Sequence, residues 1–141
     1  MQTASPLRLA LLAAAAVLSA LPAAAMEDKL TIVTSFPKDL TGVYQKAFMK
    51  KHPGTKVEIL NKQTSAGIKF VQETASKNQT DMFWASAPDA FEVLKDSKLL
   101  AQYKPKAAGI PSKVGAFPIN DPDGYFFGFA ASGYGIMYNT R

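Results

Sequence analysis

The sequence predicts an α/β fold built on a mostly parallel sheet. Three short runs rich in β-branched and apolar residues each lead into a stretch with helical periodicity. Strands that alternate with helices in this way are typical of right-handed βαβ crossovers, which join parallel strands. The chain has no cysteine, so an ordinary apolar core must stabilise it without disulfides or thiolate metal sites.

The first unit begins with a predicted strand at residues 30–34 and a turn at 35–38. Asp39 can cap the helix that follows, and residues 52–54, His-Pro-Gly, end that helix because proline cannot continue the hydrogen-bond ladder. The spacing of its apolar residues predicts one face directed at the core. These residues are Leu40, Val43, Tyr44, Ala47 and Phe48.

The second and third units repeat this pattern. Strands are expected at residues 56–60 and 81–85. Thr64 or Ser65 can cap the second helix, and Pro88 suits the first turn of the third. The residues expected to face the core on these helices are Phe70, Val71, Thr74, Ala75, Phe91 and Leu94, with Val93 a weaker candidate, and Leu99-Leu100 is expected to dock the chain as it leaves the third helix.

The later part of the chain differs from the three units. Proline and glycine throughout residues 101–124 predict a long irregular segment, with one short turn of helix near Ser112. Loops of this length are usually functional or mobile. Residues 125–130 predict a further strand, and residues 134–138 continue as an extended apolar run.

The N-terminus has the pattern of a secretory signal. Arg8 precedes an apolar run at residues 9–21, Pro22 breaks it, and Ala23-Ala24-Ala25 offers small residues for cleavage. The run is shorter than the roughly 20 residues that span a bilayer. We therefore expect cleavage after Ala25 and a free protein outside the inner membrane; the alternative is an uncleaved membrane anchor.

Composition limits the classes of partner. The formal net charge is +5, but the lysines are scattered along the chain rather than clustered. Scattered lysine is typical of a solvated surface, so no nucleic-acid partner is expected, although the basic balance also suits a small anionic ligand. No sequence motif for a cofactor is present, so none is expected.

A ligand site is predicted at the carboxyl ends of the three strands. Ligands of open α/β sheets bind there, and the N-termini of the following helices favour carboxylate, phosphate or phosphonate groups. Serine and threonine in these loops can alternatively serve only as helix caps. The predicted ligand-facing residues are Ser35 and Phe36, then Ser65, Ala66 and Gly67, then Ser86 and Ala87, with Ser132, Gly133 and Tyr134 as a fourth group.

The residues do not predict a catalytic site. His52 is the only histidine, and it is expected at the helix end far from the strand carboxyl ends. No Ser-His-acid set, metal-ligand cluster or phosphate-binding glycine loop occurs in the sequence. Phe83 is expected in the sheet core, whereas Trp84 fits the core and a ligand platform equally well because it lies at the ligand end of its strand.

Four segments of the chain resemble a known family. They are residues 30–36, 51–57, 81–86 and 128–139, of which the last is the most specific. They are similar to the periplasmic solute-binding proteins of ABC importers, in the two-lobed type II branch that includes binders of ferric iron, phosphonates, thiamine and polyamines. The resemblance covers essentially residues 26–141.

The resemblance implies a three-layer α/β sandwich that captures a small polar or anionic solute and delivers it to an ABC permease of the inner membrane. Because such proteins are much longer, residues 26–141 are expected to be an incomplete N-terminal lobe. Iron is not implied, since that branch binds it mainly through tyrosines of the remaining part. The alternatives are a truncated fragment or secreted interaction module without ligand binding, and a secreted enzyme.

Overall fold

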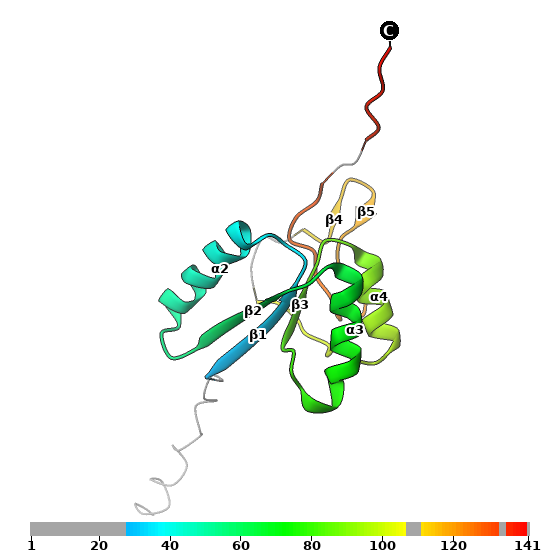
Figure 1. The fold of residues 1–141 in the computed structure, drawn as a ribbon. Helices are drawn as coiled ribbons and strands as arrows, with labels where there is room; N and C mark the ends of the chain where they lie inside the picture. The colour runs from blue at the N-terminus through cyan, green and yellow to red at the C-terminus, as the bar shows by residue number, and fades with distance from the viewer. Residues whose placement is uncertain (1–27, 107–110, 133–134, 141) are drawn as a thin grey trace, which may run out of the picture.

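A computed structural model describes residues 28–106, 111–132 and 135–140. The predicted leader, residues 1–25, lies outside this part of the chain. Strands and helices alternate as expected, followed by a small hairpin (Figure 1). The elements are β1 (Lys29–Thr34), α2 (Lys38–Lys51), β2 (Lys56–Asn61), α3 (Thr64–Thr74), the 3-10 helix η1 (Ala75–Lys77), β3 (Met82–Trp84), α4 (Pro88–Asp96), β4 (Lys113–Val114) and β5 (Phe117–Pro118).

The three long units form one parallel sheet in the order β2-β1-β3. β1 is the central strand and pairs in parallel with both neighbours. Thr34, its last residue, lies opposite Asn61 of β2 and Trp84 of β3. The prediction of a parallel sheet is confirmed, and the carboxyl ends of all three strands lie at the same level.

Helices cover both faces of this sheet. Successive side chains of a strand point to opposite faces. Val33 and Phe83 face α3, since both lie within van der Waals distance of the place where a Cβ of Gly67 would be. Trp84 points the other way, and its ring meets the edge of Tyr44 on α2. Helix α2 therefore lies on one face, and α3 with its neighbour α4 on the other (Figure 1).

The core lies between the sheet and the pair α3 and α4. Val33, Val71 and Leu94 are buried together, and further apolar residues pack around them. Pro88 is in the first turn of α4, as predicted. Among the predicted core residues of α4, Leu94 is fully buried, but Val93 is exposed. Leu99 and Leu100 pack on this cluster as the chain leaves α4, which confirms their predicted docking.

The predicted inward face of α2 is correct only in part, for the half-buried Phe48 and for Tyr44, whose exposed ring still meets Trp84. Thr41 is the only fully buried residue of this helix, and Gln45 and Phe48 follow it on the same side. The Gln45 side chain donates a hydrogen bond to the Val57 carbonyl of β2 at 2.8 Å. Val43 is 66% exposed. Strand β2 lies at the edge of the sheet, and an edge strand has backbone groups that no neighbouring strand pairs with. Gln45 satisfies one of these groups, so this polar side chain faces the sheet where an apolar one was expected.

Four residues of α2 that were expected to face the core are exposed instead: Leu40, Val43, Tyr44 and Ala47. Phe48 is half-buried.

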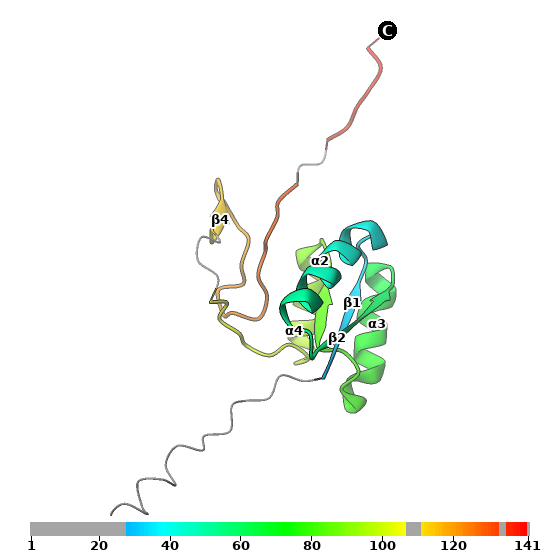
Figure 2. The same ribbon diagram turned by 90° about the vertical axis from the view of Figure 1, so that its left-hand side faces the viewer.

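The segment after α4 forms a separate layer beside the sheet (Figure 2). A hairpin of β4 and β5 replaces the helical turn expected near Ser112, with Gly115 at a positive φ of 59° between the strands. Residues 125–130 are not a strand. They lie antiparallel to residues 119–121, but among the described residues the pairing amounts to one isolated bridge, between Phe127 and Asn120.

Two helical glycines provide a test of this packing. Gly42→Ala on α2 adds a Cβ that meets nothing within 4 Å, so the better helix propensity of alanine should stabilise the chain by about 0.5–1 kcal/mol. Gly67→Ala on α3 places a Cβ 3.0 Å from the Phe83 ring and 3.3 Å from Val33, so it should lose that gain and destabilise the chain by about 1–3 kcal/mol. Urea unfolding followed by circular dichroism measures both. Equal effects of the two variants would contradict the described packing of α3.

Candidate functional site

Loops from all three strands meet at the carboxyl edge of the sheet. Ser35 and Phe36 follow β1, and Ser86 and Ala87 follow β3, which pairs with β1 at its last residue. Asn61, at the end of β2, donates a side-chain hydrogen bond to the Phe36 carbonyl. The topology therefore brings the predicted groups after β1 and β3 together at this edge.

The loop after β1 is held in place by Thr34. This side chain is fully buried, and its Oγ1 accepts the Phe36 N–H at 3.1 Å. The Thr34 carbonyl accepts the Lys62 N–H at 2.9 Å, which extends the pairing of β1 and β2 into both loops. The backbone of Phe36 is thereby anchored from two strands.

The three helices that start at this edge have no side-chain caps. Their N-cap residues are Pro37, Gln63 and Ala87, none of which makes a capping hydrogen bond with its side chain. The predicted caps Asp39 and Thr64 or Ser65 are wrong, because these residues lie within the first turns. The first-turn N–H groups, which carry a partial positive charge, are therefore not occupied by a capping side chain.

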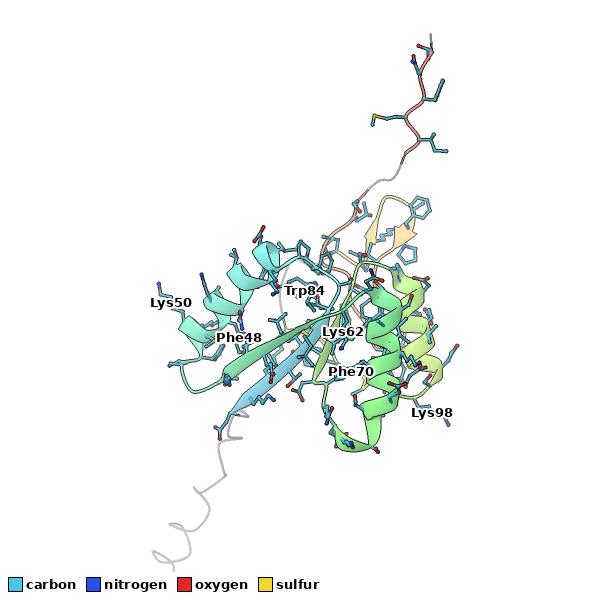
Figure 3. The ribbon with its side chains drawn as sticks, in the orientation of Figure 1. Phe48, Lys50, Lys62, Phe70, Trp84 and Lys98 are labelled. Carbon is cyan, nitrogen blue, oxygen red and sulfur yellow. The ribbon has the colours of Figure 1, made fainter. Side chains whose placement is uncertain are left out.

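An aromatic cluster occupies the α2 side of the same edge. The Trp84 ring lies 5.2 Å from Phe36, 5.5 Å from Tyr44 and 5.9 Å from Phe129, measured between ring centroids. We call these four residues the Trp84 cluster; Figure 3 shows Trp84 between α2 and the sheet. Its rings come from the β1 loop, from α2, from β3 and from the segment after β5.

Within the described residues, the indole N–H of Trp84 has no hydrogen-bond partner. The side chain is 9% exposed, and its Nε1 is one of two buried side-chain polar atoms without a partner in the described part of the chain; the other is Oγ1 of Thr80. A buried donor without an acceptor costs about 1–3 kcal/mol. A buried donor of this kind calls for an acceptor, and it lies at the edge of the sheet where α/β proteins bind their ligands.

The family comparison agrees with this architecture. A model of the bacterial extracellular solute-binding protein family matches residues 33–141. The chain belongs to this family. A search of the curated proteins gives no significant match. Extracellular solute binding for transport is thus the general function of the family to which the chain belongs.

For this solute-binding protein, the sequence anticipated the edge at which the loops after β1 and β3 meet, but only part of its surroundings; a ligand site there stays a prediction. Tyr44 was expected in the core, and Phe129 was expected in a strand. Neither was proposed as a ligand residue. One sequence feature did indicate the cluster. Trp84 is the last residue of β3, so its ring lies at the carboxyl edge of the sheet. Phe129 lies within the most specific segment of the family resemblance.

The positions of the other predicted site residues do not by themselves assign them a role. Ser65, Ala66, Ser86 and Ser132 are exposed, and Gly133 and Tyr134 lie outside the described residues.

Gly67 is buried against the sheet. Glycine is favoured at this position because a larger side chain would crowd Phe83 and Val33. A ligand contact through its backbone stays a prediction.

The opposite edge of this solute-binding protein has different chemistry. An open hollow of about 440 Å³ lies near the amino ends of the strands, with Lys29, Glu58 and Asp81 in its lining. Lys29 hydrogen-bonds to Glu58 at 2.6 Å and lowers the pKa of this carboxyl. Ligands of open α/β sheets bind at the carboxyl edge, so the hollow is not the favoured site.

Candidate catalytic groups are not assembled in the described part of the chain. His52 is the C-cap of α2, as expected, with its ring 4.7 Å from Phe48 and at the opposite end of the helix from the ligand edge. Within residues 28–106, 111–132 and 135–140, no group of three or more acidic or histidine side chains suits a metal ion. None of the helices in these ranges has the length and hydrophobicity to cross a membrane.

Substitutions of Trp84 test whether its donor is unpaired. Trp84→Phe should change the free energy of unfolding by less than about 1 kcal/mol, because the lost volume is offset by removal of a donor whose burial costs about 1–3 kcal/mol. Trp84→Ala should cost about 3–5 kcal/mol, since the whole ring is lost. Urea unfolding followed by far-ultraviolet circular dichroism compares them. An equal loss in both variants would show that the indole N–H is paired.

Proposed function

We propose that this chain is the substrate-binding component of an ABC importer, which captures a small polar or anionic solute outside the inner membrane and delivers it to a permease. Family membership supplies the general function. The observation that carries the ligand site is the unpaired indole N–H of Trp84 at the carboxyl edge of the sheet. Three helix N-termini without side-chain caps begin at this edge.

The proposed solute has two chemical parts. Oxygen acceptors pair with the indole N–H of Trp84 and with N–H groups of the helix N-termini, where partial positive charge favours an anion. The body of the solute lies against the rings of Phe36 and Phe129, which are half-buried and exposed, respectively. Ser35, Ser65 and Ser86 supply hydroxyl groups to the polar part. This division agrees with a small anionic or polar solute.

We further propose that residues 26–141 are the N-terminal lobe of a type II solute-binding domain with a three-layer sandwich. The parallel order β2-β1-β3 and the helices on both faces of the sheet support this classification. A leader cleaved after Ala25 would place the lobe in the periplasm. No catalytic role and no cofactor belong to this proposal.

The second candidate is a secreted interaction module without solute binding. The observation that favours it is the exposure of apolar side chains outside the sheet: Val43 on α2 is 66% exposed, and Met137 is 100% exposed. Large exposed apolar surfaces often mark protein contacts. A dependence of stability on a solute separates the two candidates.

Solute binding should appear as stabilisation of the full chain. We expect one compound of a panel of phosphate, methylphosphonate, glucose 6-phosphate and acetate to raise the unfolding free energy by about 2.7 kcal/mol at a hundredfold excess over its dissociation constant. Trp84→Phe should abolish most of this gain because it removes the free donor.

The matched control for this experiment is Phe117→Ala, whose ring is 77% exposed on the hairpin strand β5. This variant should keep the full gain. Absence of any stabilisation by the panel, together with self-association of the chain in sedimentation experiments, would favour the interaction module.

Export should remove the leader. When residues 1–141 are produced in a bacterium with an outer membrane, N-terminal sequencing of the protein in the periplasmic fraction should begin at Met26. Ala23→Leu together with Ala25→Leu should block cleavage, because the cleavage site needs small side chains. Intact protein with Met1 in the membrane fraction of the unsubstituted chain would contradict the proposed location.

A further inference from the structure

An ion-pair cluster joins helix α4 to the segment after β5. Lys95 on α4 donates from Nζ to Asp121 Oδ1 at 2.7 Å and to Asp123 Oδ2 at 2.9 Å. We call these three residues the Lys95 clamp. The Asp121 side chain is 1% exposed. A buried carboxylate needs its partner much more than an exposed one does, because an unpaired charge in the interior is strongly unfavourable.

Asp121 also organises the backbone of its own loop. Its second carboxylate oxygen accepts the Tyr125 N–H at 2.9 Å. Its backbone N–H donates to the Phe126 carbonyl at 3.1 Å, and its carbonyl accepts the Gly124 N–H at 3.1 Å. Gly124 has a positive φ of 82°, which glycine adopts without strain. The clamp thereby sets the shape of residues 121–126 and not only their attachment.

The charge state of the clamp is consistent with this role. Burial by itself raises the pKa of Asp121, but the hydrogen bonds from Lys95 and from the Tyr125 N–H outweigh it and lower this pKa. The hydrogen bonds to Asp121 and Asp123 raise the pKa of Lys95. The Tyr125 ring lies 5.3 Å from Lys95 Nζ. Both charges therefore persist around neutral pH, and the pairing is lost only as acid protonates Asp121 below its usual range.

A short rigid path leads from the clamp to the Trp84 cluster. Phe126 stacks on Phe91 of α4 with the ring centroids 5.3 Å apart. The Gly128 N–H donates to the Ile119 carbonyl at 2.8 Å. A Cβ on Gly128 would lie 2.6 Å from that carbonyl oxygen, so the backbone approach tolerates no side chain. The next residue, Phe129, is the one whose ring lies 5.9 Å from Trp84.

We propose that Lys95 is a positioning residue for the ligand edge: through Asp121 it holds the segment that places Phe129 against Trp84. The consequence for a solute rests on the proposed function. The positioning role of Lys95 does not rest on the proposed function, because it describes contacts within the chain when no solute is bound. The opposing possibility is that the stacking of Phe126 on Phe91 holds the segment without the ion pair.

The single tryptophan of the chain makes this measurable. We expect Lys95→Met in the full chain to raise the acrylamide quenching constant of Trp84 by about twofold or more, because the loop opens locally and its Phe129 ring no longer covers the indole. Phe129→Ala should give a similar increase. The double variant should add little to either single change, as two residues on one path are not additive.

The controls separate positioning from loss of stability. Lys95→Arg keeps a charged donor and should restore quenching close to that of the unsubstituted chain. Lys69→Met removes an exposed ion pair on α3, with Lys69 and Glu73 3.7 Å apart, and should leave quenching unchanged. Circular dichroism under the same conditions should show native helix content in every variant.

Two outcomes would overturn the proposal. In a folded Lys95→Met variant, unchanged quenching while Phe129→Ala increases it would show that the clamp does not position the ring. If Lys95→Met does not fold, Lys95→Gln decides, since it keeps a polar side chain and removes the charge that pairs with Asp121. Increased quenching in that variant supports the proposal, and unchanged quenching refutes it.

Failure of the proposed function gives a different result. A chain that no solute of the panel stabilises, but whose quenching follows this pattern, retains the positioning role of Lys95 and loses the transport proposal. A chain that binds a solute equally well with Lys95→Met and shows unchanged quenching retains solute binding and loses the positioning role.

Discussion

The pairing of β1 with both neighbouring strands is the constraint on which the rest of this structure depends. Thr34, Asn61 and Trp84 lie side by side at the end of the sheet because β1 is parallel to β2 and to β3. Every helix that follows a strand must then begin at the same edge. The convergence of loops, helix N-termini and aromatic rings is a consequence of this register, and no local feature of any one loop would produce it.

The two faces of the sheet are covered in different ways. On the α3 and α4 face, Val33, Val71 and Leu94 form a conventional apolar core. On the α2 face, the contacts include a hydrogen bond from Gln45 to an edge strand and a hydroxyl of the buried Thr41, which donates to the Pro37 carbonyl at 3.3 Å. Burial of polar groups costs free energy unless each is hydrogen-bonded, and both are. The contact of the Tyr44 ring with Trp84 on this face lies at the ligand edge.

Aromatic residues at that edge depend on distant parts of the chain. Phe36 and Trp84 are brought together by the sheet, whereas Phe129 reaches Trp84 only because its segment returns to α4. The return is fixed by a pair of residues 26 positions apart, Lys95 and Asp121. An ion pair between a helix and a buried loop carboxylate can therefore influence a site whose residues it does not touch. That is a physical link between the stability of the loop and the shape of the site.

The alternation of strands and helices, the parallel sheet and the edge at which a ligand is expected could all be predicted from the amino-acid sequence. These features depend on local properties: β-branched runs, helical periodicity, and proline or glycine at boundaries such as Pro53 and Pro88. A family resemblance in short segments pointed to the same class of protein that the family comparison supports.

Three features could not be predicted from the sequence and depend on long-range packing: the side of α2 that faces the sheet, the residues at the helix N-termini and the rings around Trp84. The apolar spacing of α2 predicted Val43 inward, but the Val57 carbonyl on an edge strand accepts a hydrogen bond from Gln45, and the side of the helix that carries Gln45 faces the sheet instead. Similarly, residues 125–130 have the composition of a strand, but in the described structure their pairing with residues 119–121 is limited to one isolated bridge, and composition does not specify how far such pairing extends. Contacts between residues far apart in the chain have no periodic signature, so pattern alone does not reveal them.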